Sequence, residues 1–158
     1  MKAEVIFSYT AMGRGRDGDR YTNRLTISSS FDDPAKWPYV LKTVSESSRG
    51  GTTTVTGQEE IKISKDVFLS IKHIIASHPE LMTCKRSIDN GSMDGSIEHM
   101  TFACDSFSCQ IGGDSIRGSA AYEMEKYPRA RWSDNATVYA VYLEIKNALD
   151  AAGLTYLY

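Results

Sequence analysis

The chain has 158 residues, of which 41% are hydrophobic and 24% are charged, and this composition excludes a wholly disordered protein. A net charge of −2 argues against binding of nucleic acid or an anionic membrane through overall charge. The net charge is +2 over residues 1–50 and −4 over residues 51–158. An anionic ligand is therefore expected in the N-terminal part.

The cysteine count and the N-terminus predict a cytoplasmic protein. Three cysteines are too few for a disulfide framework. Residues 1–4 lead directly into a strand-like segment instead of an apolar signal core, and every apolar run is too short to cross a membrane. We expect a reducing compartment, no membrane association and no cofactor.

Two alternating segments, residues 5–9 and 25–28, predict antiparallel neighbouring strands. Between them, residues 10–20 contain three glycines and three arginines and are predicted to form a long loop. Pro38 suits a first helical position, so residues 38–47 are predicted to form a short helix that ends before Gly50. Residues 52–56 and 59–63 are predicted to be strands joined by a turn at Gly57.

Two amphipathic helices are predicted farther along the chain. The first covers Lys65 to His78, with Ser64 as its N-cap and Pro79 beyond its end. The second covers Asp134 to Ala152, with Gly153 as the residue that follows its C-cap. Their apolar stripes are Phe68, Ile71 and Ile75 in the first helix and Val138, Tyr142, Ile145, Leu149 and Ala152 in the second.

Between these helices, residues 87–96 are predicted to be a loop, and residues 100–111 a hairpin that turns at Asp105 and Ser106. Residues 117–132 carry no clear pattern, and residues 155–158 have strand composition. The sequence thus predicts a single α+β domain over residues 1–158. Its mainly antiparallel sheet has five to seven strands, with two or three helices packed on one face.

Two basic segments are candidate binding sites. Arg14, Arg16 and Arg20 lie among glycines that let backbone amides approach an anion, although the segment leads into a strand and contains two aspartates. Arg129, Arg131 and Trp132 have the mixture of basic and aromatic residues that suits single-stranded nucleic acid. A solvated hairpin tip and a connector packed on the core are the respective alternatives.

The sequence predicts no metal site and locates no catalytic set. His99 and Cys104 differ by an odd number along one strand, so they point to opposite faces. Their spacing with Cys84 and Cys109 matches no usual zinc pattern. No histidine is placed beside a nucleophile by any local motif, which disfavours an enzyme without excluding one.

These features favour a small protein-interaction module, such as an inhibitor or immunity-type protein that binds and blocks another protein. One alternative is a small enzyme acting on a nucleotide or other phosphorylated substrate, with the arginine-rich segment as the anion clamp. The third is a nucleic-acid-binding protein. A concave pocket with converging polar groups would favour the enzyme, and an exposed apolar or protruding surface the interaction module.

Overall fold

A computed structural model describes residues 3–15, 18–88 and 97–157. Within them the chain forms seven strands: β1 (Glu4–Arg14), β2 (Arg20–Ser29), β3 (Tyr39–Arg49), β4 (Thr52–Lys62), β5 (Ser87–Ile88), β6 (Ile97–Ala103) and β7 (Ser108–Asp114). Three α-helices accompany them: α1 (Lys65–Ala76), α2 (Ile116–Lys126) and α3 (Asp134–Ala151). Short 3₁₀ helices follow α1 and α2: η1 (Pro79–Thr83) and η2 (Arg129–Arg131). The α+β class is confirmed.

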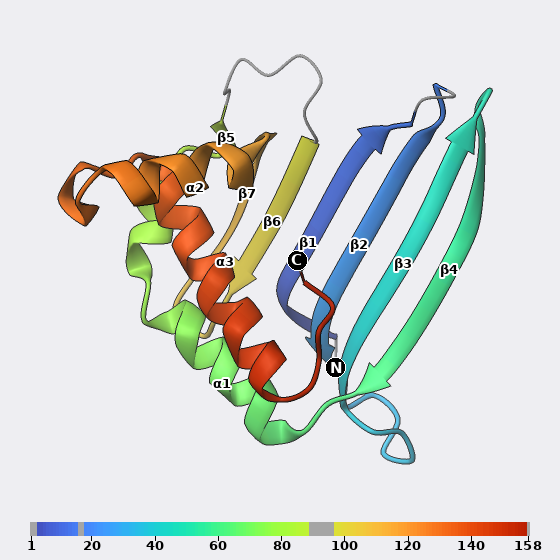
Figure 1. The fold of residues 1–158 in the computed structure, drawn as a ribbon. Coiled ribbons are helices and arrows are strands. Elements are labelled where there is room, and N and C mark those ends of the chain that lie inside the picture. Colours follow the sequence, from blue (N-terminus) through green and yellow to red (C-terminus); the bar gives the residue numbers. More distant parts are fainter. Residues whose placement is uncertain (1–2, 16–17, 89–96, 158) are drawn as a thin grey trace.

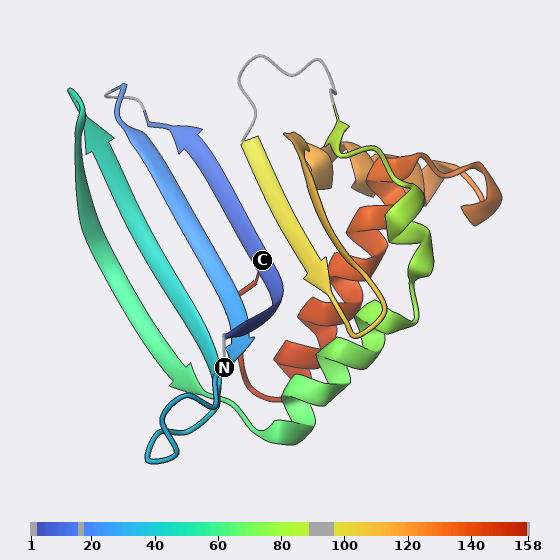
Figure 2. The same ribbon diagram turned by 180° about the vertical axis from the view of Figure 1, so that it is seen from behind.

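The strands form one sheet in the order β4-β3-β2-β1-β6-β7-β5. All neighbours are antiparallel except β5 and β7, which are parallel. The three α-helices cover one face, and none of the described residues forms a helix on the opposite face (Figures 1 and 2). The helices lie over the β1 and β5–β7 side, so β3 and β4 project beyond them as an outer wing (Figure 1).

The core lies between the helices and a row of apolar side chains across the sheet. Phe7 pairs with both Ile27 and Phe102, and the row continues through Leu41. All four are fully buried, as are the predicted stripes of α1 and α3, apart from a small exposure at Phe68 and from Ala152, which is exposed just after the end of α3. No helix within the described ranges is long and apolar enough to span a membrane.

Both predicted amphipathic helices are confirmed within two residues. The Ser64 hydroxyl accepts a hydrogen bond from the backbone N–H of Val67 at 3.1 Å, as an N-cap does. Gly153 has a φ of +79°, and the N–H of Leu154 donates to the carbonyl of Leu149 at 2.9 Å. Gly153 therefore reverses the chain after α3, in the conformation that glycine tolerates best.

The predicted hairpin is also confirmed, with Phe102 opposite Cys109 and Met100 opposite Ile111. These four side chains are buried, while Cys104 near the turn is half-buried. The patternless segment 117–132 contains most of α2, together with η2. α2 packs against α3, and these tertiary contacts stabilise a helix that the sequence of α2 alone does not predict.

The predicted helix over residues 38–47 is wrong, because these residues form most of β3. Its residues pair on one side with β2 and on the other with β4. The apolar residues Val40, Leu41 and Val44 fit a strand as well as a helix, and Leu41 is the one that is fully buried. Two flanking strands satisfy the backbone polar groups that a helix would have satisfied internally.

Two predicted breaks in the sheet are also wrong. No turn occurs at Gly57: β4 is continuous, and its pairing with β3 shifts there because Thr56 is an extra residue. The predicted loop over residues 10–20 is mostly strand, since β1 runs to Arg14 and β2 starts at Arg20. Of the predicted loop 87–96, residues 87 and 88 form β5, and the remaining residues lie outside the described residues. The strand expected from the composition of residues 155–158 does not form over residues 155–157.

Candidate functional site

A groove of about 370 Å³ opens on the helix-bearing face, where the sheet extends past α3. It is lined by residues from β1, β2, β3, α2, α3 and the C-terminal segment: Tyr9, Ala11, Asn23, Arg24, Leu25, Thr43, Val44, Ser45, Arg117, Tyr142, Tyr156 and Leu157. Strand alternation directs the Arg24 side chain to the opposite face, so Arg117 is the cation of this lining that faces the groove.

The groove exists because the side chains on this face of the sheet become smaller from one cross-strand row to the next. Next to the apolar core row lies a row with Tyr9, Leu25 and Thr43, which the strand register places side by side. The following row contains Ala11, Asn23 and Ser45. Small side chains in this last row leave space where larger ones would have filled it.

Glu98 is the centre of a polar cluster that lies behind the wall of this groove, where Tyr9, Arg117 and Tyr142 line it. It lies on β6 in phase with the buried Met100, and it is only 3% exposed. Its carboxylate accepts a hydrogen bond from the Tyr9 hydroxyl at 2.5 Å and one from Arg117 Nε at 3.1 Å. A buried carboxylate requires such donors, because burial without them would be strongly unfavourable.

The same carboxylate caps helix α2. Its Oε1 accepts the backbone N–H of Arg117 at 3.3 Å, in the first turn of α2. Ser115, the residue before the helix, has a φ of +49° and makes no side-chain capping bond. Glu98 thus supplies, from a neighbouring strand, the negative charge that a helix N-terminus favours.

The Arg117 guanidinium lies against two aromatic rings that also contact each other. Its central carbon lies 5.4 Å from the centre of the Tyr9 ring and 5.5 Å from that of Tyr142. Its Nη1 donates to the Tyr142 hydroxyl at 3.1 Å. The side chain is one-third exposed, whereas that of Glu98 is 4% exposed. The ion pair therefore presents its positive end toward the groove and buries its negative end.

The cluster holds both tyrosines in their protonated form. Burial, followed by the hydrogen bond to Glu98, raises the pKa of Tyr9 far above its ordinary value. Burial also raises the pKa of Tyr142, although the Arg117 charge opposes this. These hydroxyls therefore serve as hydrogen-bond groups around a fixed cation. The described residues lining the groove include no histidine, cysteine or carboxylate.

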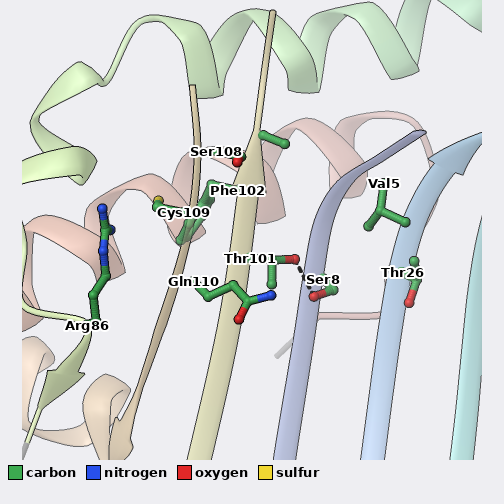
Figure 3. A pocket seen from close by; sticks show the side chains of 10 residues that line it. Val5, Ser8, Thr26, Arg86, Thr101, Phe102, Ser108, Cys109 and Gln110 are labelled. Carbon is green, nitrogen blue, oxygen red and sulfur yellow. Dashed lines mark hydrogen bonds between the residues drawn. The ribbon is translucent and has the colours of Figure 1, made fainter. Parts of the chain in front are cut away.

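A second, shallower depression of about 850 Å³ lies on the helix-free face (Figure 3). Ser8 and Thr101 face each other across β1 and β6, and their hydroxyl oxygens are 2.5 Å apart. Gln110 from β7 lies beside Thr101 (Figure 3). At its edge, Arg86 donates to the carbonyls of Leu81 and Met82, so it links the last turn of η1 to the neighbouring segment.

His99 also lies on this helix-free face and packs over Gly112. A Cβ atom added at Gly112 would lie 2.3 Å from His99 Nδ1, so this contact requires glycine. Cys109 points to the opposite, helix-bearing face, as the register with Phe102 shows. No group of three potential metal-ligating side chains occurs in residues 3–15, 18–88 and 97–157.

The predicted anion-binding arginines are not part of the groove. Arg14 and Arg20 pair across β1 and β2 at the strand ends, and both are exposed. Arg16 lies outside the described residues. Asp19 in the same connection is 3.4 Å from Arg49 Nε, which offsets part of the positive charge.

Arg129 and Arg131 lie in η2, and Trp132 directly follows it. This segment connects α2 to α3 and lies on the opposite side of the molecule from the β1–β2 connection (Figure 1). Arg129 lies over the Trp132 ring at 5.6 Å, and Arg131 over the Tyr127 ring at 5.7 Å. The Trp132 indole N–H donates to the Tyr127 carbonyl at 2.9 Å. The two predicted basic segments therefore do not combine into one surface.

None of the four members of the polar cluster, Tyr9, Glu98, Arg117 and Tyr142, was predicted as a site residue from the sequence. The available signal was Glu98, a carboxylate at the position where the alternation of Met100 and Phe102 requires a buried side chain. The partners are 19 and 89 residues away in sequence, so no local spacing could identify them.

Comparison with known proteins assigns neither a family nor a function to the chain. No family model matches the chain, and no curated protein is significantly similar to it in sequence.

Proposed function

We propose that this protein is an interaction module that binds a partner protein by accepting an extended segment of it as an additional strand beside β4. The observation that carries this proposal is the exposure of β4 at the edge of the sheet. Ten of its eleven residues are exposed, and the remaining one, Ile61, is half-buried. Exposed edges are the usual sites of strand addition.

The backbone of β4 offers alternate hydrogen-bonding groups to such a strand. The N–H of Ile63, directly after β4, donates inward to the Tyr39 carbonyl at 3.0 Å. Because backbone groups alternate in direction along an antiparallel strand, those of Gln58 and Glu60 point away from β3. An incoming strand would pair with these groups.

The composition of β4 also supports pairing. Its first seven residues, 52–58, contain four threonines and a valine and carry no charge or proline. Charges and prolines are the devices that protect an edge from unwanted pairing. The bulge at Thr56 limits how far one partner strand can follow the edge, which gives the site a defined register.

An inhibitor or immunity-type role is the specific form of this proposal, since an added strand can hold another protein in a blocked state. The cytoplasm remains our proposed location, supported by three cysteine thiols that form no disulfide. The proposed enzyme with an arginine clamp receives less support, because Arg14 and Arg20 do not line the groove. The nucleic-acid alternative receives little, because the rings of Tyr127 and Trp132 already contact arginines.

The test is a comparison of Gln58→Pro with Gln58→Ala in retention of binding partners from host lysate, measured by quantitative mass spectrometry. Both variants lose the Gln58 side chain, but only proline removes the outward N–H and adds a ring at the edge. We expect a partner that is retained by the wild type and Gln58→Ala and lost with Gln58→Pro. Melting curves establish that all three proteins are folded. Equal retention by all three would overturn strand addition at β4.

A further inference from the structure

We propose that the groove beside Arg117 binds a small organic anion, a carboxylate or phosphate monoester with a compact apolar body. This site is independent of the β4 edge and of the partner proposed for it. Its volume of about 370 Å³ is at the small end of the range for ligand pockets.

The preference for an anion follows from the charges at the groove. No acidic residue occurs among the described residues that line it. Arg117 presents a cation that is one-third exposed, while its counter-charge on Glu98 is buried behind it. Glu59 lies at the far rim, where it accepts a hydrogen bond from the Tyr156 hydroxyl at 3.3 Å. The positive end of the groove is therefore the end beside α2.

The guanidinium is also held in position before any ligand arrives. Glu98, Tyr142 and the two tyrosine rings hold it from several sides. A side chain that is already ordered loses little conformational entropy on binding, so its contact with an oxyanion is more favourable. Arginine suits both carboxylate and phosphate oxygens, which is why the structure defines the charge class rather than one acid.

The floor of the groove provides further donors and an apolar surface. Ser45 Oγ donates to Asn23 Oδ1 at 2.8 Å, which fixes the amide so that its nitrogen remains a donor end. Leu25 and Leu157 are buried at 4% and 5% exposure and line the same groove. A ligand with one charged end and one compact apolar end matches this combination.

The test uses three probes of similar size, phenyl phosphate, benzoate and uncharged benzyl alcohol, titrated into isotopically labelled protein and followed by amide chemical shifts. We expect at least one of the two anions to bind, with shift changes concentrated at the groove residues. Benzyl alcohol should bind at least about tenfold more weakly, because it lacks the charge that Arg117 contacts. Binding of one anion alone supports the proposal and decides between phosphate and carboxylate.

The matched variants are Asn23→Asp and Asn147→Asp. Both add one negative charge at an exposed position, but Asn147 lies on α3 and does not line the groove. The carboxylate introduced by Asn23→Asp can still accept a hydrogen bond from Ser45, so the fold should persist. We expect Asn23→Asp to weaken anion binding about tenfold by repulsion, and Asn147→Asp to leave it within about twofold.

Three results would overturn the proposal. The first is equal binding of benzyl alcohol and the anions, which would show an apolar groove without charge preference. The second is the absence of any binding at millimolar concentrations. The third is a map of shift changes that falls on Arg14 and Arg20 or on Arg129 and Arg131 instead of the groove. The shift map on wild-type protein decides the matter even if a variant does not fold.

Discussion

The helix-covered half of the sheet and its outer wing share one hydrogen-bonding pattern but differ in burial. Strand β6 alternates buried residues with exposed or half-buried ones, because one of its faces packs beneath the helices. Strand β4 has ten exposed residues out of eleven, although it pairs along its whole length with β3. Strand pairing and burial are therefore separate properties: hydrogen bonds extend the sheet, and helices decide which part of it becomes core.

The two regions should consequently differ in how they respond to change. The covered half depends on dense packing, so each lost or altered side chain affects the whole fold. The wing depends on backbone pairing and on cross-strand contacts, each of which contributes a fraction of a kilocalorie. A region with few buried contacts is also the kind that binding partners can reorganise at small cost.

The largest expected difference is between Leu149→Asp and Val55→Asp. Leu149 is fully buried on α3, so an aspartate there would place an unpaired charge in the core and cost more than about 5 kcal/mol. Val55 is 54% exposed on β4, and the same change should remain within about 0.5 kcal/mol. Urea unfolding followed by circular dichroism measures both. A folded Leu149→Asp protein would contradict the assignment of this helix face to the core.

The next largest effect concerns the polar cluster at the boundary between the two regions. Arg117→Met leaves the Glu98 carboxylate buried without its ionic partner. Loss of one partner from a fully buried pair costs about 3–5 kcal/mol, and the partial exposure of Arg117 reduces our expectation to about 2 kcal/mol.

Arg24→Met is the control, because Arg24 is exposed on β2 and its loss should change the free energy of unfolding by less than about 0.5 kcal/mol. Urea unfolding of both variants gives the comparison. Equal effects of the two substitutions would show that Glu98 does not depend on Arg117.

A smaller effect is expected at alkaline pH. The pKa of Tyr9 is raised in the folded protein above its ordinary value of 10.0, so the folded state keeps a proton that the unfolded state releases. The stability contributed by this group is complete below pH 10 and is lost as the pH rises toward the folded pKa, by up to about 1.4 kcal/mol per pH unit.

Unfolding measured from pH 8 to pH 11 should therefore show a steeper decline for the wild type than for Tyr9→Phe. Tyr122→Phe serves as the control, since Tyr122 is 60% exposed and should leave the wild-type slope unchanged. A Tyr9→Phe protein with the same slope as the wild type would contradict the protonated role of Tyr9.

The smallest effect is expected at the end of the β1–β2 hairpin. Arg14 and Arg20 lie opposite each other across the two strands, where like charges repel slightly. Replacing both with alanine should leave the free energy of unfolding within about 0.5 kcal/mol of the wild-type value. A melting curve tests this, and a large loss of stability would mean that the hairpin end contributes to the fold.

Much of the covered half could be predicted because its signals are local. The Ser64 cap, the stripe of Phe68, Ile71 and Ile75, and the alternation around Phe102 all act within a few residues. The wing was predicted poorly for the opposite reason. Residues 38–47 fit a helix or a strand by local pattern, and the pairing with β2 and β4 decides between them.

The candidate sites show the same division between local and distant information. The sequence predicted binding sites at two groups of arginines because their charges cluster within short stretches: Arg14 and Arg20, and Arg129 and Arg131. The structure places these clusters apart and assembles a different one from β1, β6, α2 and α3. A cluster whose members are separated by tens of residues leaves no pattern in any short window.

The sequence by itself determined the two long helices, the central hairpin and the α+β class, because capping, periodicity and alternation are properties of neighbouring residues. Only the tertiary structure decided that β3 and β4 extend the sheet, that α2 is a helix, and that Arg117 contacts Tyr9, Tyr142 and the buried Glu98. Each of these depends on contacts between distant segments, which fix the conformation of residues whose local preferences are weak.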